Sequence, residues 1–260
     1  GIAAARHDRL VLTDADCLPG PAWAHSMASR LGGPDAPPHI LLGFSLPDGG
    51  PAWPQFDALR VAWQYGSLAA AGAPYMGVGR NLTYRKSDWM RIGGFGHHLD
   101  LASGDDDLFV QDAAGAGLAC WPVAASGANA ACPTQPASSS RDAFRRKTRH
   151  LTTAPHYRRR VRWTLATDAL LDPLVAAMAV AGAAGLVHIG DWIPLVAAGL
   201  ALTVRSATLS SFVRDLDHPG SIALRAFGLG PLRWALLGLA TLSTFTSSPT
   251  WTQRAPTNRS

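Results

Sequence analysis

The chain has 260 residues, of which 47% are hydrophobic, and this composition excludes an intrinsically disordered protein. Three cysteines without CxxC spacing, Cys17, Cys120 and Cys132, argue against a disulfide framework and against a zinc site. The net charge is +5, but the segment Arg141–Arg162 holds nine basic residues against one acid, Asp142. A basic excess confined to one segment suits an anionic lipid, a phosphorylated substrate or nucleic acid.

Short apolar runs alternate with polar helical segments over the first part of the chain. The pattern predicts strands at Arg9–Thr13, His39–Ser45 and Leu118–Val123, and helices at Pro21–Leu31, Trp53–Ala71 and Asp105–Ala116. Strands that alternate with helices are typical of an α/β layered fold.

The composition changes after Trp163. The run Pro173–Ile189 contains no acid, lysine or arginine, and a second apolar run, Trp192–Val204, and a third, Trp234–Phe245, follow it. Because a membrane-spanning helix needs about 20 apolar residues, with a range of about 17–25, the first run just meets this length and the others must extend past neighbouring arginines. We expect an α-helical membrane region, with buried helices of a soluble domain as the alternative. The basic segment before it predicts a cytoplasmic location for the first part of the chain.

Two acidic stretches carry candidate chemistry. In LTDADC, Asp14 and Asp16 follow the first strand, and two carboxylates this close together favour a hard cation, Mg²⁺ or Mn²⁺, between them. A solvated turn is the alternative. In SGDDDLFV, three aspartates open a helix, where the helix dipole explains one or two of them. A remaining carboxylate is available as a general base.

Two further stretches could contact a ligand. In GVGRNLTYRKS, Gly77 and Gly79 allow a ligand to approach the backbone closely, although a tight turn into a strand explains the same pattern. In RRKTRH, Arg146 and Arg149 are three residues apart and share one face of a helix. They could clamp a diphosphate or face lipid headgroups.

In this order the four stretches resemble a membrane-bound family 2 glycosyltransferase with a GT-A fold, over about Gly1–Tyr157. The resemblance implies an α/β fold, a partial GT-A (Rossmann-like) catalytic domain at 1–163, an α-helical membrane region at 164–250 and a tail at 251–260. Such proteins usually begin with nucleotide-binding strands, whereas here the Asp-x-Asp strand begins at Arg9. The resemblance therefore implies that about 100 residues precede Gly1, a length that suits half of a domain.

The resemblance also implies roles for single residues. Asp14 and Asp16 would hold Mg²⁺ or Mn²⁺ against the diphosphate of a nucleotide-sugar donor, and the catalytic base would be Asp105 or Asp106. Asp107 would be a helix-start residue. The cleft for donor and acceptor would be lined by Gly79, Arg80, Asn81, Arg146, Arg149 and His150. The last three stand where many members have Gln-x-x-Arg-Trp, so the missing Gln and Trp argue against a processive polysaccharide synthase.

The expected activity is metal-dependent, inverting glycosyl transfer to a hydroxyl of a saccharide or lipid-linked acceptor, by a multi-pass protein whose catalytic part faces the cytoplasm at the inner membrane. One alternative is transfer to a polyprenyl-phosphate carrier. Another is a non-catalytic membrane protein that docks anionic lipid, in which Asp14, Asp16 and Asp105 do not converge. Nucleic acid is not an expected partner, because no stacking aromatic residues are interleaved with the basic ones.

Overall fold

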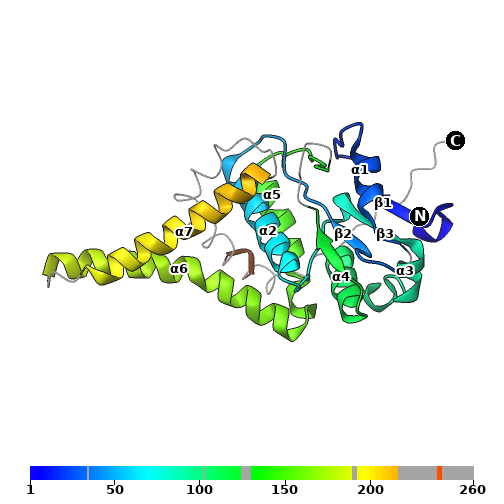
Figure 1. Cartoon of the computed structure of the whole chain (residues 1–260). Coiled ribbons are helices and arrows are strands. Elements are labelled where there is room, and N and C mark those ends of the chain that lie inside the picture. Colours follow the sequence, from blue (N-terminus) through cyan, green and yellow to red (C-terminus); the bar gives the residue numbers. More distant parts are fainter. Residues whose placement is uncertain (34, 102, 124–129, 189–191, 216–238, 242–260) are drawn as a thin grey trace.

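The computed structural model describes residues 1–33, 35–101, 103–123, 130–188, 192–215 and 239–241. They form an α/β body and a hairpin of two long helices, α6 (Arg159–His188) and α7 (Ile193–Asp215), which projects away from the body (Figure 1). The predicted α/β class and the apolar helices after the α/β part are therefore confirmed.

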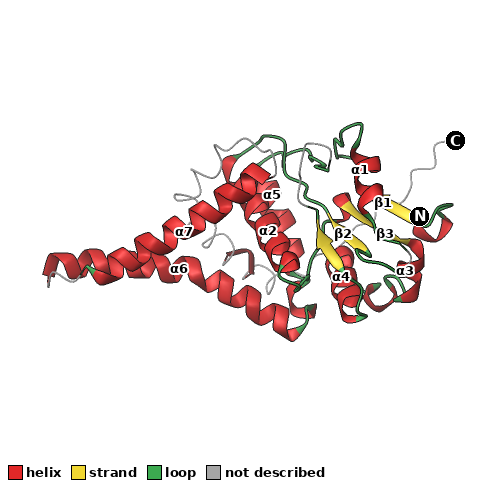
Figure 2. Ribbon diagram, viewed as in Figure 1, coloured by secondary structure: helices red, strands yellow, loops and turns green. Residues whose placement is uncertain are grey.

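One mixed sheet forms the centre of the body (Figure 2). Its strands are β1 (Arg9–Leu12), β2 (Ile40–Leu42), β3 (Leu82–Arg85) and β4 (Cys120–Pro122), in the spatial order β1-β3-β2-β4. Strands β1 and β2 pair antiparallel to β3, whereas β4 pairs parallel to β2, so only β3 runs in the opposite direction. The carboxyl ends of β1, β2 and β4 therefore meet the amino end of β3 at one edge, which we call the carboxyl edge.

The helices of the body are α1 (Trp23–Arg30), α2 (Ala52–Ala70), α3 (Lys86–Arg91), α4 (Asp105–Gly115) and α5 (Ser140–Leu151). Successive side chains of a strand point to opposite faces of the sheet. In β2, Ile40 and Leu42 accordingly join the main core with side chains of α2 and α4, whereas Leu41 packs in a smaller core beneath α1. Both faces of this strand are buried, which explains its continuous apolar sequence.

Each predicted strand and helix of the body is present, with ends within three residues of the prediction. The largest difference is at β2, which ends at Leu42 rather than Ser45. A Cβ on the next residue, Gly43, would lie 2.3 Å from the side chain of Asn81, so the backbone after β2 passes too close to that amide to carry a side chain. The third apolar run, 234–245, lies outside the described residues apart from 239–241.

The hairpin is docked on the body by the inner ends of its helices. Leu165 of α6 and Leu209 and Phe212 of α7 pack into the main core, where the Phe212 ring meets the Phe44 ring edge-on with centroids 5.2 Å apart. The expected domain boundary at 163 therefore falls inside α6. By length and mean hydropathy, 27 residues from 159 and 20 residues from 193 are apolar enough to cross a membrane.

Candidate active site at the carboxyl edge

Four loop segments meet at the carboxyl edge, where ligands bind in many α/β proteins. They are 13–17 after β1, 43–45 after β2, 79–81 before β3 and 130–134 after β4. Thr13 Oγ1 lies 3.3 Å from Cys132 Sγ, and Ser45 Oγ donates a hydrogen bond of 2.5 Å to the Cys132 carbonyl. Arg80 Nε donates to Ser45 Oγ at 3.0 Å, so one polar chain connects the arginine to the loop after β1.

Asn81 holds these segments together from inside the core. Its side chain is fully buried; Nδ2 donates to the carbonyls of Phe44 at 2.7 Å and Ala130 at 3.0 Å, and Oδ1 accepts from Trp23 Nε1 at 3.0 Å. All the polar atoms of this amide are occupied by protein. The predicted ligand contact by Asn81 is therefore corrected to a positioning role.

The acidic triplet lies at the start of α4 and contacts the glycine segment. Gly79 N donates a hydrogen bond of 2.7 Å to Asp106 Oδ2, so two stretches 27 residues apart in sequence meet in space. The backbone turns into α4 at Gly104 with φ of 87°, where a side chain would also strike Thr153. The Asp105 side chain is exposed, Asp106 is half-buried and Asp107 is buried.

Asp106 has the electrostatics of a proton acceptor near neutral pH. Burial raises the pKa of Asp106 to about 6, the Gly79 N–H opposes this, and the neighbouring charge of Asp105 adds to it. A carboxyl with this pKa is mostly ionised at pH 7 and still binds a proton well enough to take one from a substrate. A carboxyl with a pKa perturbed in this way is a candidate for a functional site.

Asp107, expected only as a helix-start residue, is part of the site's support. Its carboxylate accepts a short hydrogen bond from the Tyr157 hydroxyl, and its side chain is almost completely buried. Burial and the charge of Asp106 raise the pKa of Asp107 well above its usual range. Because Tyr157 lies two residues before α6, this bond connects the acidic triplet to the base of the helical hairpin.

Tyr65 of α2 is buried close to Arg80 and to the acidic triplet. Its hydroxyl donates to the Gly43 carbonyl at 2.7 Å, and burial raises its pKa, with Arg80 opposing and Asp106 adding to the shift. The sequence gives no local signal for this role, because Tyr65 lies in the middle of an apolar helix face. The sequence gives no local signal for Ser45 and Cys132 either, because only the fold connects them to Arg80.

Helix α5 brings part of the basic segment to the same edge. Desolvation and the nearby cations Arg149, Lys147 and Arg80 lower the pKa of His150. The imidazole nevertheless keeps an exposed surface, so we give the three cations the greater weight in this shift. Lys147 Nζ pairs with Asp57 of α2 at 2.9 Å, which fixes α5 on the body.

The two predicted clamp arginines differ in their environment. Arg146 pairs with Asp142 one turn earlier on α5 at 3.0 Å, and both are solvent-accessible. Arg149 is exposed, and its side chain makes no hydrogen bond or ion pair with the part of the chain that the structure describes. Arg149 is therefore the better candidate to contact an anionic ligand, and Arg146 contributes first to the helix.

Asp14 and Asp16 lie on the exposed loop that follows β1. No group of three or more His, Cys, Asp or Glu side chains that could hold a metal ion occurs among the described residues. Two carboxylates do not make a protein-only cage. They do fit Mg²⁺ or Mn²⁺, because Mg²⁺ in nucleotide enzymes is commonly bound by one or two carboxylates together with substrate phosphates and water.

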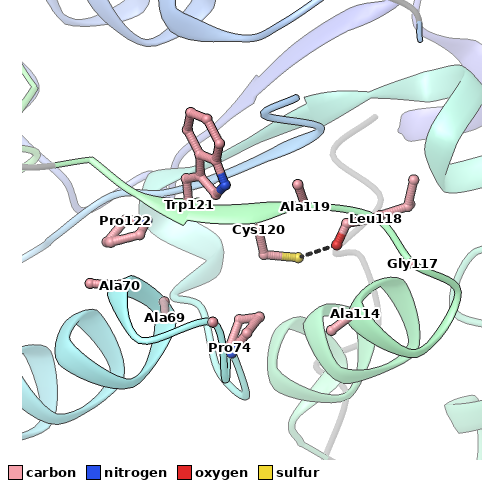
Figure 3. Close-up of a pocket in the computed structure, with 11 residues that line it drawn as sticks. Ala69, Ala70, Pro74, Ala114, Gly117, Leu118, Ala119, Cys120, Trp121 and Pro122 are labelled. Carbon is pink, nitrogen blue, oxygen red and sulfur yellow. Dashed lines mark hydrogen bonds between the residues drawn. The ribbon is translucent and has the colours of Figure 1, made fainter. Parts of the chain in front are cut away.

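A pocket of about 550 Å³ lies elsewhere, between the carboxyl ends of α2 and α4 and strand β4. Figure 3 shows its mainly apolar lining, with Pro74, Ala114, Cys120 and Trp121 around it. The acidic triplet is at the opposite end of α4. Because no charged side chain lines the pocket, we assign the chemistry to the polar loops at the edge and not to the pocket.

Neither a scan against protein-family models nor a search of curated proteins finds a match for this chain. The functional interpretation therefore depends on the geometry of the site and on the sequence resemblance.

Proposed function

We propose that the protein is a metal-dependent, inverting glycosyltransferase that uses a nucleotide-diphosphate sugar and works at the cytoplasmic membrane face. The observation that carries the proposal is the hydrogen bond of 2.7 Å between Gly79 N and Asp106 Oδ2. It joins the predicted ligand segment to the predicted catalytic acids at the edge of the sheet where ligands commonly bind. Its acceptor is a carboxyl whose pKa is suited to general base catalysis.

In this proposal Asp106 takes the proton from the acceptor hydroxyl. The resulting oxygen nucleophile attacks the anomeric carbon of the donor, the bond from that carbon to the diphosphate breaks, and the nucleoside diphosphate leaves. Attack on the face opposite the leaving group inverts the configuration. Asp105, exposed one residue earlier, is the alternative base, and Arg80 and Arg149 are the candidates to bind the negative charge that develops on the diphosphate.

Asp14 and Asp16 would hold Mg²⁺ or Mn²⁺ in this function. A bound divalent ion neutralises charge on the leaving diphosphate. The polar chain from Thr13 through Cys132 and Ser45 to Arg80 places the loop that carries these aspartates beside the arginine. The aspartates and the arginine would therefore contact the same part of the donor.

A lipid-linked acceptor, such as a polyprenyl phosphate, is favoured by one specific observation. Arg141, Arg145 and Arg149 recur every four residues on α5, and all three are exposed. This spacing places them on one face of the helix. A row of arginines that begins at the site would attract a phosphate held at a membrane surface.

The test is release of nucleoside diphosphate by the protein in the full length its gene encodes, extracted in mild detergent and given a panel of nucleotide sugars with and without Mn²⁺ or Mg²⁺. We expect metal-dependent release from one donor. Asp16→Asn removes one ligand charge and should abolish the metal-dependent part, whereas the exposed Asp35→Asn should leave it unchanged. Equal activity of Asp16→Asn and the parent would refute the metal role.

Acceptors are then compared with the identified donor. Stimulation by a polyprenyl phosphate, but not by free saccharides, would assign the lipid-linked acceptor. Silence across all donors, with the protein folded and retained in membranes, would favour the non-catalytic lipid-docking protein instead.

A further inference from the structure

The two long helices divide into an inner part that belongs to the α/β body and an outer part that leaves it. The division is marked by four charged residues, Arg60, Asp168, Asp172 and Arg205, which we call the ionic junction. Arg60 of α2 is buried and its Nη2 lies 3.0 Å from Asp168 Oδ2 on α6, an oxygen that also accepts from Gln64 Nε2 at 2.7 Å. Arg205 of α7 pairs with Asp172 and lies 3.8 Å from Asp168.

The inner parts, 159–172 and 205–215, are anchored by apolar contacts as well. Leu165, Leu209 and Phe212 pack in the core that also holds the sheet. Drawing these segments into a bilayer would bring Arg60 and the middle of α2 with them, or would break the junction and leave ionised groups without partners. Both changes are costly, because ionised side chains are strongly disfavoured in hydrocarbon.

The outer parts have the character of a lipid-exposed surface. Six of their large apolar side chains are exposed to solvent in the structure: Leu174, Val180, Ile193, Val196, Leu200 and Val204. Close packing of the two helices at Gly182, whose Cβ position would lie 2.4 Å from the backbone of Leu195, leaves the other faces free to contact lipid.

The outer parts are too short to cross a bilayer. On α6, Pro173 to His188 contains 16 residues, or about 24 Å of helix, and on α7, Ile193 to Val204 contains 12 residues, or about 18 Å. The hydrocarbon core is about 30 Å thick. The missing length could come only from the inner parts, which the ionic junction and the core hold on the body.

We infer that the hairpin of α6 and α7 is a one-sided membrane anchor: it inserts its outer parts, 173–188 and 193–204, into the lipid bilayer from the side of the α/β body and does not reach the opposite surface. Asp191, in the connection between the helices, opposes deep insertion. A single carboxyl that can take a proton nevertheless costs less to bury than the four ionised groups of the junction. The inference does not depend on the proposed transfer reaction.

Two single-cysteine positions test the topology, in a Cys17→Ser background because Cys120 and Cys132 are buried. Ile193→Cys places a thiol at the outer end of the hairpin, and Ala166→Cys places one on an exposed face of inner α6. Right-side-out and inverted membrane vesicles that carry each variant are washed with alkaline carbonate and treated with a membrane-impermeant maleimide, before and after detergent.

We expect Ala166→Cys to react in one vesicle orientation, and Ile193→Cys to react in neither orientation until detergent is added. Reaction of Ile193→Cys in the orientation opposite to Ala166→Cys would show that the hairpin crosses the bilayer and would overturn the inference. Reaction of both in the same orientation, or loss of the protein in the carbonate wash, would show that the hairpin is not inserted and would overturn it as well. None of these outcomes depends on enzyme activity.

Discussion

Replacing Asp106 by asparagine should stabilise the protein at neutral pH while abolishing transfer. Among the residues that the structure describes, the Asp106 carboxylate is paired only with backbone N–H groups, and it lies between two other aspartates in sequence, so its negative charge is poorly compensated in the folded state. An asparagine keeps an oxygen that accepts from Gly79 N, carries no charge and cannot take a proton from an acceptor. If the Asp106 carboxylate stabilised the fold, its replacement by asparagine would instead lower the stability.

The magnitude follows from proton linkage. The pKa of Asp106 is raised from 3.8 to about 6, and each unit of pKa is worth about 1.4 kcal/mol. A folded-state pKa above the unfolded value gives stability that is complete below about pH 4 and is lost as pH rises through about 6. The parent therefore carries the full cost at pH 7.5, up to about 3 kcal/mol, and about 1–3 kcal/mol after allowance for the partial exposure of the side chain.

The assay is thermal unfolding in mild detergent between pH 4.5 and 7.5. A gain of about 1–3 kcal/mol raises Tm by about 3–10 °C at pH 7.5 for a domain of this size, and the gain should shrink toward pH 4.5. Asp107, whose pKa is also raised, leaves a residual fall in stability with pH in the variant. Asp100→Asn, at an exposed position, is the control and should change neither Tm nor activity. A lower Tm for Asp106→Asn at pH 7.5, or a gain that does not vary with pH, would refute this reasoning.

Three further substitutions separate binding from folding. Arg149→Ala should weaken donor binding about tenfold in calorimetry and leave Tm unchanged, because the side chain is exposed; an equal loss of stability would indicate a structural role. Gly104→Ala should lower the free energy of unfolding in urea by at least about 2 kcal/mol, since φ is 87° and a Cβ would lie 2.1 Å from Thr153; an unchanged midpoint would contradict this. Asn81→Ala should cost about 3 kcal/mol or more, because it removes three buried hydrogen bonds at once; a mild effect would mean that water replaces the amide.

The sequence alone determined the α/β class of the fold and located six elements of its body, β1, β2, β4, α1, α2 and α4, whereas the strand β3 entered only as an alternative explanation of the glycine segment. Apolar runs such as the one at β2 and the acidic start of α4 are local signals, and local propensity and dipole electrostatics are sufficient to place them. The apolar character of α6 and α7 was equally evident, because it depends on composition within single segments.

The tertiary structure decided which polar residues face the site and which support it. The sequence predicts that Asn81 donates a hydrogen bond to a ligand beside Arg80. In the structure its amide points inward, because it is hydrogen-bonded to three buried partners from distant segments. Asp107 and Tyr157, fifty residues apart, form a buried pair that no local pattern predicts. These pairings are non-local, so their energies depend on how the segments pack and not on the residues beside them in sequence.

The tertiary structure also set the usable length of the apolar hairpin. Composition gives two helices long enough for a membrane, but the pairing of Arg60 with Asp168 and the burial of Phe212 against Phe44 hold their inner parts on the body. The physical reason is that hydropathy sums over one segment at a time. Whether a segment can enter lipid also depends on the ion pairs and core contacts that it would have to break, and only the folded chain specifies those.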